Sequence, residues 1–272
     1  AGKVFRPAAM PLWLWTTLGI VTLSLSIQSF HAIWHGQPTI TVGFLILLAF
    51  ERLDARHPLA AGAALALAAS IKLMPAIFVL VFLFDRQFRA TAAFVVFGAM
   101  LALLSVLLAG WPLHLEFLAS LHKVSSVAIL SGINVSLLPA ALALGAATGL
   151  LPAIDPDAKT LLFAAPPVWV GPAIMLAGLG VIVAMSRVSA ALPARMRRGI
   201  GLFALAIILA LFGPLGWLHY YLLPMLLLPG LFGILPRSVA GALILLVGLP
   251  SLAPVFSLVA FPASPVADYV WY

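Results

Sequence analysis

A lysine inside an apolar run is the residue of this sequence whose type and position most directly suggest chemistry. Lys72 stands in "AASIKLMPAIF" (68–78), within a largely apolar stretch from Leu59 to Phe84, and Pro75 follows three residues later. A charge at the centre of a bilayer helix costs about 2.5–3.5 kcal/mol on insertion scales, and such charges usually mark functional sites. Lys72 is therefore a candidate anion ligand. The alternative is that it snorkels to the interface or hydrogen-bonds helix-end carbonyls.

A histidine in an aromatic cluster is the second candidate, in "GWLHYYLLP" at residues 216–224. Such a cluster at a helix entrance is typical of an interfacial belt. The functional alternative is that His219 joins Lys72 in holding an anion. Three aromatic side chains would then shape a lipid or sugar site: Trp217, Tyr220 and Tyr221. A lysine point charge and a histidine donor suit a phosphate, and an anion in a membrane recess suggests a lipid phosphate.

Signatures of other chemistries do not occur in the sequence. There is no HExxH metal-ligand spacing, no GxSxG and no phosphate-binding glycine loop. Without cysteine, the chain has neither disulfides nor thiolate metal ligands. We therefore expect no metal and no other cofactor.

The composition defines the elements that must position these side chains. Of 272 residues, 64% are hydrophobic and 8% are charged, against roughly 25% charged residues in a soluble domain. Long apolar runs recur, and only helices and closed barrels span membranes. The alternating pattern of a barrel is not seen, so the sequence predicts an all-α, polytopic transmembrane protein. The net charge of +7 lies in short loops, which favours membrane orientation over nucleic-acid binding.

Apolar stretches predict the helices, within one transmembrane domain that covers residues 1–272. They are residues 12–30, 38–50, 59–71, 73–84, 90–109, 135–151, 167–186, 199–216, 219–235 and 238–259.

The basic residues predict which loops are cytoplasmic. Eleven of the 14 fall in a few clusters that the positive-inside rule assigns to the cytoplasm: Lys3, Arg6, Arg52, Arg56, Arg86, Arg89, Arg187, Arg195, Arg197, Arg198 and Arg237. The polar groups expected on the outer side are His31, His35, Gln37, Lys72, His114, Glu116, His122, Lys123, Asn134, Asp155, Asp157, Lys159, His219 and Asp268.

This assignment predicts a hairpin over residues 59–84. A straight helix would place "ERLDARH" (51–57) and "DRQFR" (85–89) on opposite sides, whereas a break at "KLMP" keeps both inside. Pro75 favours the break, because it removes a backbone donor and pushes Met74 away from α geometry.

The lengths of the short segments predict a recess. Each arm has 12–13 residues, or roughly 18–20 Å, short of a core of about 30 Å. Segment 38–50 is equally short and starts from the same outer side, so Lys72 should line an outward-facing, water-filled cavity. Segment 135–151 is expected to be re-entrant or interfacial, and 110–134 to form an outer loop.

Four stretches carry a resemblance to a known family. "GQPTITVGFLILLAF" followed by "AAGAALALAASIKLMPAIFVLVFLFDRQFRA" resembles the GQ-then-KxxP core of glycosyltransferase family 87, the α-mannosyltransferase group with the C-type membrane fold. "GINVSLLP" and "GWLHYYLLP" are similar to that family's later Asn-x-Ser and Trp-x-His segments, in the expected order. The resemblance covers about residues 30–235.

The resemblance implies a bacterial inner-membrane enzyme with its active face outward. Such an enzyme transfers a sugar, here mannose, from a polyprenyl phosphate to a lipid or glycan acceptor, with inversion and without a nucleotide sugar. Gln37, Lys72, Asn134 and His219 fall at the matched positions, and Tyr220 and Tyr221 adjoin them. Lys72 and His219 would hold the donor phosphate and stabilise the leaving group. The expected partners are this donor, the acceptor, membrane lipids and other membrane subunits, but not nucleic acid.

Two departures from the family pattern leave an alternative open. Related enzymes have a catalytic aspartate well upstream of the GQ segment, and many have an arginine after the Asn-x-Ser. Neither occurs here, so we expect the chain to be the C-terminal part of a longer protein, with its catalytic residue unknown. The alternative is a catalytically silent membrane subunit that packs in a larger complex. The outer carboxylates Glu116, Asp155, Asp157 and Asp268 have no motif around them.

Overall fold

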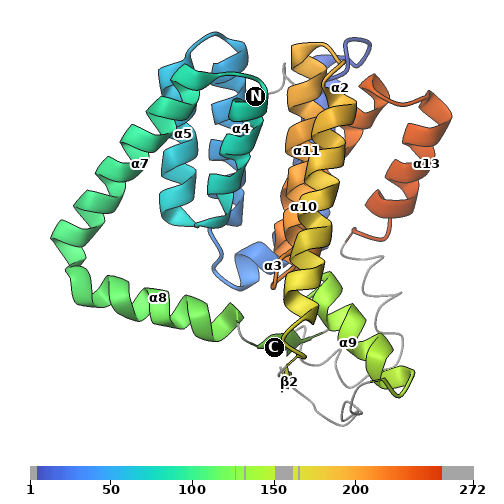
Figure 1. Ribbon diagram of the computed structural model, residues 1–272. Coiled ribbons are helices and arrows are strands. Elements are labelled where there is room, and N and C mark those ends of the chain that lie inside the picture. Colours follow the sequence, from blue (N-terminus) through green and yellow to red (C-terminus); the bar gives the residue numbers. More distant parts are fainter. Residues whose placement is uncertain (1–4, 126, 132, 151–161, 165, 253–272) are drawn as a thin grey trace.

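A computed structural model describes residues 5–252 except 126, 132, 151–161 and 165, and it confirms the all-α fold class. Two of its helices are long and apolar enough to cross a membrane, α7 (Phe88–Ala109) and α10 (Val170–Ser189). A third candidate span is the bent pair of α3 (Ile27–Trp34) and α4 (Thr39–Asp54). Most helices run up and down between two ends of the molecule (Figure 1).

The remaining elements complete the described fold. They are α2 (Leu12–Leu25), α5 (Pro58–Ile71), η1 (Met74–Phe78), α6 (Val79–Phe84), α8 (Trp111–Ser125), β1 (Ala128–Leu130), α9 (Leu137–Ala147), β2 (Leu162–Ala164), α11 (Ala194–Phe212), η2 (Leu218–Tyr221), α12 (Leu222–Leu227), η3 (Leu228–Gly233) and α13 (Arg237–Gly248). The two strands pair antiparallel, with Ile129 opposite Phe163.

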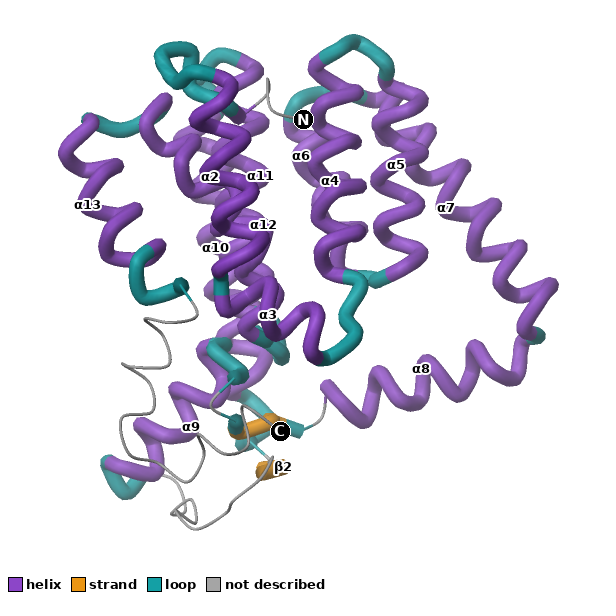
Figure 2. The backbone as a smooth tube through the Cα atoms, turned by 180° about the vertical axis from the view of Figure 1, so that it is seen from behind, coloured by secondary structure: helices purple, strands orange, loops and turns teal. Residues whose placement is uncertain are grey.

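The predicted hairpin is present. Helix α5 ends at Ile71, Lys72 is extended (φ −147°, ψ 128°), and the chain returns through the 3-10 turn η1 into α6 (Figure 2). The extended residue is thus Lys72 and not Met74, because Met74 already belongs to the 3-10 turn that Pro75 starts. The lysine therefore stands at the tip of the hairpin, where no helix continues past it.

Three helices end in the same way. In each, the second residue after the helix has positive φ, and the N–H of the next residue bonds a carbonyl five residues back, the pattern of a Schellman motif. The positive-φ residues are Gly36 (59°), Arg56 (61°) and Arg86 (54°), and the closing bonds are Gln37 N to Ala32 O, His57 N to Arg52 O and Gln87 N to Phe82 O. These caps reverse the chain sharply, so that no long loop is needed after each helix.

Salt bridges join the three arginine-containing loops at one end of the molecule. Arg198 Nε lies 3.0 Å from Asp85 Oδ2, and its Nη1 lies 3.1 Å from Asp54 Oδ1. Arg197 bonds the same Asp85, whose side chain is buried. The loops after α4, after α6 and before α11 are therefore neighbours, as the charge distribution predicted.

Close packing holds the hairpin against its neighbours. The largest fully buried side chains include Phe50 on α4, Phe78 on η1 and Phe82 on α6. Helix α5 lies against α7 at Gly62, where an added Cβ would be 2.5 Å from the carbonyl oxygen of Ala90. Small residues at such positions let helix backbones approach closely in a membrane.

Several boundaries differ from the prediction. Segment 12–30 is interrupted at Ser26, whose extended backbone ends α2 and whose hydroxyl caps α3 at Ser29 N (3.2 Å). Helix α4 has 16 residues because the charged "ERLD" adds a turn at the loop end, so it is longer than the two arms of the hairpin. Residues beyond 252 of the predicted segment 238–259 lie outside the described residues.

The outer loop expected over 110–134 contains a helix. Helix α8 follows α7 and turns away from it (Figure 1), and His114 bonds both the Gly110 carbonyl (2.8 Å) and Ser105 (3.1 Å) across the corner. Large apolar side chains of α8 are exposed, among them Trp111 and Phe117. Their exposure is typical of a helix that lies at a membrane interface.

Candidate functional site

Lys72, Gln37 and His219 meet at the end of the hairpin, although 35 and 147 residues separate the two partners from the lysine. Lys72 Nζ lies 3.4 Å from Gln37 Oε1 and 3.5 Å from His219 Nε2. It also lies 4.2 Å from the centroid of the Tyr220 ring, over the face of the ring. We call these four residues the Lys72 cluster.

A glycine turn places Gln37 in this cluster. The chain bends by 119° between α3 and α4, and Gly36 takes the positive φ that the turn requires (59°). Gln37 N is fixed on Ala32 O at 2.7 Å. The side chain of Gln37 therefore projects from the start of α4 toward the tip of the hairpin.

The 3-10 turn η2 supplies His219 and Tyr220. His219 is buried, and its ring meets the edge of Tyr220 at 4.8 Å between centroids. In this tight turn two consecutive side chains both reach Lys72, one by a ring nitrogen and one by its π face. Two residues of "WLHYY", His219 and Tyr220, therefore contact the lysine.

The ammonium of Lys72 is only weakly satisfied. It has three N–H donors, but its two hydrogen bonds are at the long limit for such bonds, and the salt bridges among the described residues do not include it. A positive charge held in this way in a half-buried position favours an anionic ligand.

Helix α4 adds to the positive potential at this point. Its first residue, Thr39, lines a small cavity of about 30 Å³ together with Lys72 and Tyr220. No side chain caps α4, and the Thr39 hydroxyl is buried without a partner among the described residues. Free N–H groups at the start of a helix attract anions. The sequence predicted a water-filled recess at Lys72, and the cavity beside Lys72 has a volume of only about 30 Å³.

Asn134 lies outside the Lys72 cluster and holds backbone together. It is buried, its Nδ2 donates to Ile129 O (2.8 Å), and its Oδ1 accepts from Gly216 N (2.8 Å) and more weakly from Ser136 N (3.4 Å). The amide group is thus occupied by the backbone. Asn134 positions the segment that leads into η2 and does not face the ammonium.

Tyr221 belongs to the same connection. Its hydroxyl donates to Val135 O (2.9 Å), and the backbone bonds Val135 N to Gly216 O (2.8 Å) and Leu218 N to Ile133 O (3.0 Å) lie beside it. We call this set of bonds between residues 129–136 and 216–221 the clamp. Of the six residues predicted for the site, four form the Lys72 cluster and two, Asn134 and Tyr221, form part of the clamp.

Two histidines near the cluster were predicted for the outer side but not for the site. His31 and His35 stack on each other at 5.4 Å between centroids, and both are close enough to His219 to interact with it electrostatically. His31 is buried, with Nε2 unpaired among the described residues. Their spacing of four residues on a helix was the available signal, since it places both on one face.

Within the part of the chain that the structure describes, no hydrogen bond or salt bridge joins a carboxylate to the Lys72 cluster. Glu116 is exposed on α8. Asp155, Asp157 and Asp268 lie outside the described residues, as does Lys159. The described residues thus give the cluster a positive charge but no general base.

A polytopic helical membrane protein with a cationic, half-buried cluster at a helix break is the class that this fold and site define. A sequence model of glycosyltransferase family 87 matches residues 2–214, and the chain belongs to this family of membrane glycosyltransferases. Gln37, Lys72 and Asn134 lie inside the matched range, whereas His219 follows it. No curated protein and no solved structure matches the chain.

Proposed function

We propose that the protein transfers mannose from a polyprenyl-phosphate donor to a lipid or glycan acceptor at the outer face of a bacterial inner membrane. One observation carries the proposal: the Lys72 ammonium, without a carboxylate partner among the described residues, meets Gln37 and His219 beside the start of α4. These groups together suit a phosphate whose lipid tail stays in the bilayer.

The cluster would act on the leaving group. When the bond between the sugar and the phosphate breaks, negative charge develops on the phosphate that leaves. A fixed ammonium and helix N–H groups stabilise this charge more than they stabilise the bound donor, and this difference lowers the barrier. Gln37 and Tyr220 orient the Lys72 ammonium, and His219 can donate to a phosphate oxygen once its ring nitrogen no longer accepts from Lys72.

The distribution of charge supports an outward-facing site. The arginine-containing loops gather at one end of the molecule, where Arg198 joins two of them, and the junction of α5 and η1 lies at the opposite end of α5 (Figure 2). Because arginine-rich loops remain on the cytoplasmic side, the hairpin tip with Lys72 faces outward.

A second candidate is a catalytically silent subunit that binds the lipid-linked sugar without transferring it. It is favoured by the lack of a described carboxylate at the Lys72 cluster, since a general base must reach the acceptor hydroxyl. The two candidates share the phosphate site and differ in turnover.

The test measures binding and transfer separately, with radiolabelled polyprenyl-phosphate mannose and the native protein in membranes. We expect Lys72→Met to lose transfer by about 100-fold or more, as for removal of an oxyanion donor, while the fold persists because Met fills a similar apolar volume. Lys72→Arg should retain partial activity, since a planar fork does not replace a compact point charge.

Lys123→Met removes an exposed lysine of α8 and serves as the matched control, with transfer expected to be unchanged. Wild-type transfer by Lys72→Met would refute the phosphate site. Donor binding that depends on Lys72, but without turnover in the wild-type protein, would identify the silent subunit.

A further inference from the structure

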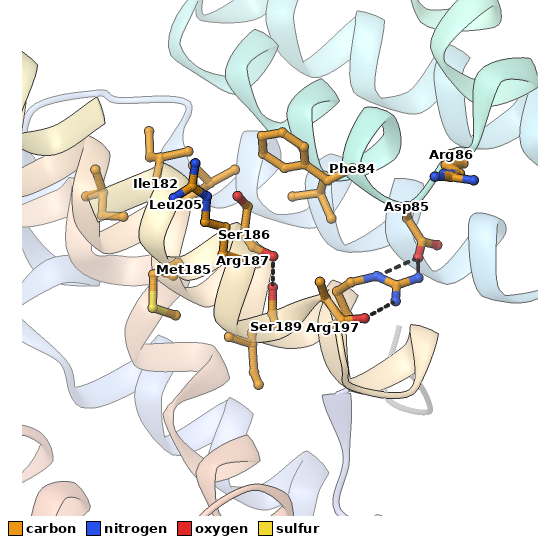
Figure 3. Close-up of a pocket in the computed structure, with 16 residues that line it drawn as sticks. Phe84, Asp85, Arg86, Ile182, Met185, Ser186, Arg187, Ser189, Arg197 and Leu205 are labelled. Carbon is orange, nitrogen blue, oxygen red and sulfur yellow. Dashed lines mark hydrogen bonds and ion pairs between the residues drawn. The ribbon is translucent and has the colours of Figure 1, made fainter. Parts of the chain in front are cut away.

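A separate cavity lies near the arginine-containing loops, away from the Lys72 cluster. It has a volume of about 480 Å³, is lined by residues of α6, α10 and α11, and shares no residue with the small cavity at Lys72. Its volume is within the range of ligand-binding pockets, about 300–1,000 Å³. Figure 3 shows its lining residues.

The residues that line this cavity are of two kinds, apolar and polar. Phe84, Ile182, Met185, Leu205 and Ile208 form an apolar wall. Helix α10, which supplies two of these residues, is long and apolar enough to span a membrane and has only a small buried fraction. The wall is therefore suited to a hydrocarbon chain that enters from the lipid.

The charged residues that line the cavity carry an excess of positive charge. Asp85 is already paired with Arg197 and Arg198. Arg86 and Arg187 also line the cavity, and neither side chain has a hydrogen bond or salt bridge among the described residues. Two arginines thus remain without an acidic partner beside an apolar cavity.

We propose that this cavity binds an anionic phospholipid of the cytoplasmic leaflet. One acyl chain lies between α6, α10 and α11, and the phosphate lies beside Arg187, while Arg86, on the other side of the cavity beyond Asp85 (Figure 3), adds to the positive potential. Charge complementarity supports this occupant, because basic pockets between transmembrane helices on the cytoplasmic side bind acidic lipid head groups. A zwitterionic lipid offers the same chains but no net charge.

The position of the cavity distinguishes this lipid from the sugar donor. The cavity adjoins the salt bridges of Asp85, which follows α6 at the end of the hairpin away from Lys72. A phospholipid here would contact α6 and α11 together, so its binding would strengthen their packing without touching the Lys72 cluster.

Native mass spectrometry of the purified protein, with phosphatidylglycerol and phosphatidylcholine of identical chains, tests the site. We expect one phosphatidylglycerol to bind at least about tenfold more tightly than phosphatidylcholine. Arg86→Gln and Arg187→Gln, separately and together, should reduce this preference, and the double variant should bring it close to one.

Arg89→Gln is the matched control, because Arg89 is exposed at the start of α7 and does not line the cavity. It should keep the full preference. Equal affinity of the wild-type protein for both lipids, or an equal effect of Arg89→Gln and the double variant, would overturn the proposal.

A second pair of variants tests the acyl-chain site. Ala204→Trp fills the cavity and should abolish the bound phosphatidylglycerol, whereas Ala184→Trp, on an exposed position of α10 outside the cavity, should not. If Ala204→Trp does not fold, the arginine variants still decide the outcome. One-to-one displacement of phosphatidylglycerol by a polyprenyl phosphate would show that the occupant is wrong.

Discussion

Lys72 has a full positive charge on three N–H groups, yet the described residues give it only two long hydrogen bonds and one aromatic face. A structural lysine would normally be paired with a carboxylate or reach water, because an unpaired charge is costly in an apolar environment. An ammonium that is positioned but not neutralised is the arrangement expected of an anion site.

The ring nitrogen of His219 can be tested separately from its ring packing. His219→Phe keeps a ring that can pack against Tyr220 but removes the nitrogen that faces Lys72. We expect binding of the polyprenyl-phosphate donor, or sugar transfer, to fall by about tenfold or more, because a hydrogen bond from the ring to the phosphate is lost. The melting temperature should change little. Donor titration and thermal unfolding in detergent measure the two effects.

His57→Phe is the control for this substitution, since His57 is exposed in the loop at the other end of the molecule. It should leave donor binding unchanged. If His219→Phe binds the donor as well as the wild-type protein does, His219 belongs to an interfacial aromatic belt and not to the phosphate site.

At the residue level, the sequence predicted all four residues of the Lys72 cluster but did not reveal the clamp, to which Asn134 and Tyr221 belong. Lys72 was predictable because a charge in an apolar run is costly wherever the chain folds. The role of Asn134 was not, since an amide that caps backbone and an amide that binds a sugar look the same in sequence. Only the contacts with Gly216 and Ile129 distinguish them.

The clamp holds the 3-10 turn η2 in place, and substitution of Asn134 tests this role. In Asn134→Ala the buried N–H of Gly216 and the carbonyl of Ile129 lose their partner. We expect the free energy of unfolding to fall by about 1–3 kcal/mol and transfer to fall with it. Thermal unfolding of the purified variant measures the first effect.

Thr148→Ala is the comparison for this variant, because its hydroxyl bonds only nearby carbonyls of α9 and should change stability by less than about 0.5 kcal/mol. If both variants lose the same stability, the clamp does not hold η2.

The hairpin predicts the sidedness of its two loops. The chain has no cysteine, so single cysteines can be placed at Ala55 and Phe88, which are exposed near the ends of α4 and α7. Both should react with an impermeant maleimide from the cytoplasmic side, because arginines remain inside. A third cysteine at Ala119 on α8 should react from the outer side.

Accessibility of Ala55→Cys and Phe88→Cys from opposite sides would refute the hairpin orientation. Equal reactivity of all three positions in intact cells would contradict the placement of α8.

The positions of the arginines and of Pro75 were sufficient to predict the hairpin. Other elements could not be predicted from the sequence. The break at Lys72 follows from Pro75 and from the two flanking arginine loops. Helix α8 was missed because its mixture of apolar and polar residues matches both a loop and an interfacial helix. The helix caps at Arg56 and Arg86 were also not predicted. A residue with positive φ at a helix end is usually glycine, whereas two of these three positions are arginine.

Across the whole molecule, the salt bridges of Asp85 connect helices that are distant in sequence. Asp85→Asn leaves Arg197 and Arg198 without their shared partner. We expect a loss of about 3–5 kcal/mol in the free energy of unfolding, as for removal of one partner of a buried ion pair. Denaturation in detergent, followed by circular dichroism, measures it.

Glu51→Gln breaks the more exposed pair with Arg52 and should cost less than about 1 kcal/mol. Equal effects of the two substitutions would mean that Asp85 does not fasten the loops together.

The hairpin also has a consequence for the order of assembly during synthesis. Lys72 is made 147 residues before His219, so the nascent chain must hold a bare ammonium near the membrane until η2 arrives. Neither arm is long enough to leave the insertion machinery as an independent span. The two arms therefore depend on packing against α4 and α7, which are made next to them, whereas the site also requires η2. The Lys72 cluster is thus among the last parts of the described chain to form, and a ribosome stalled before residue 219 would display the hairpin without its site.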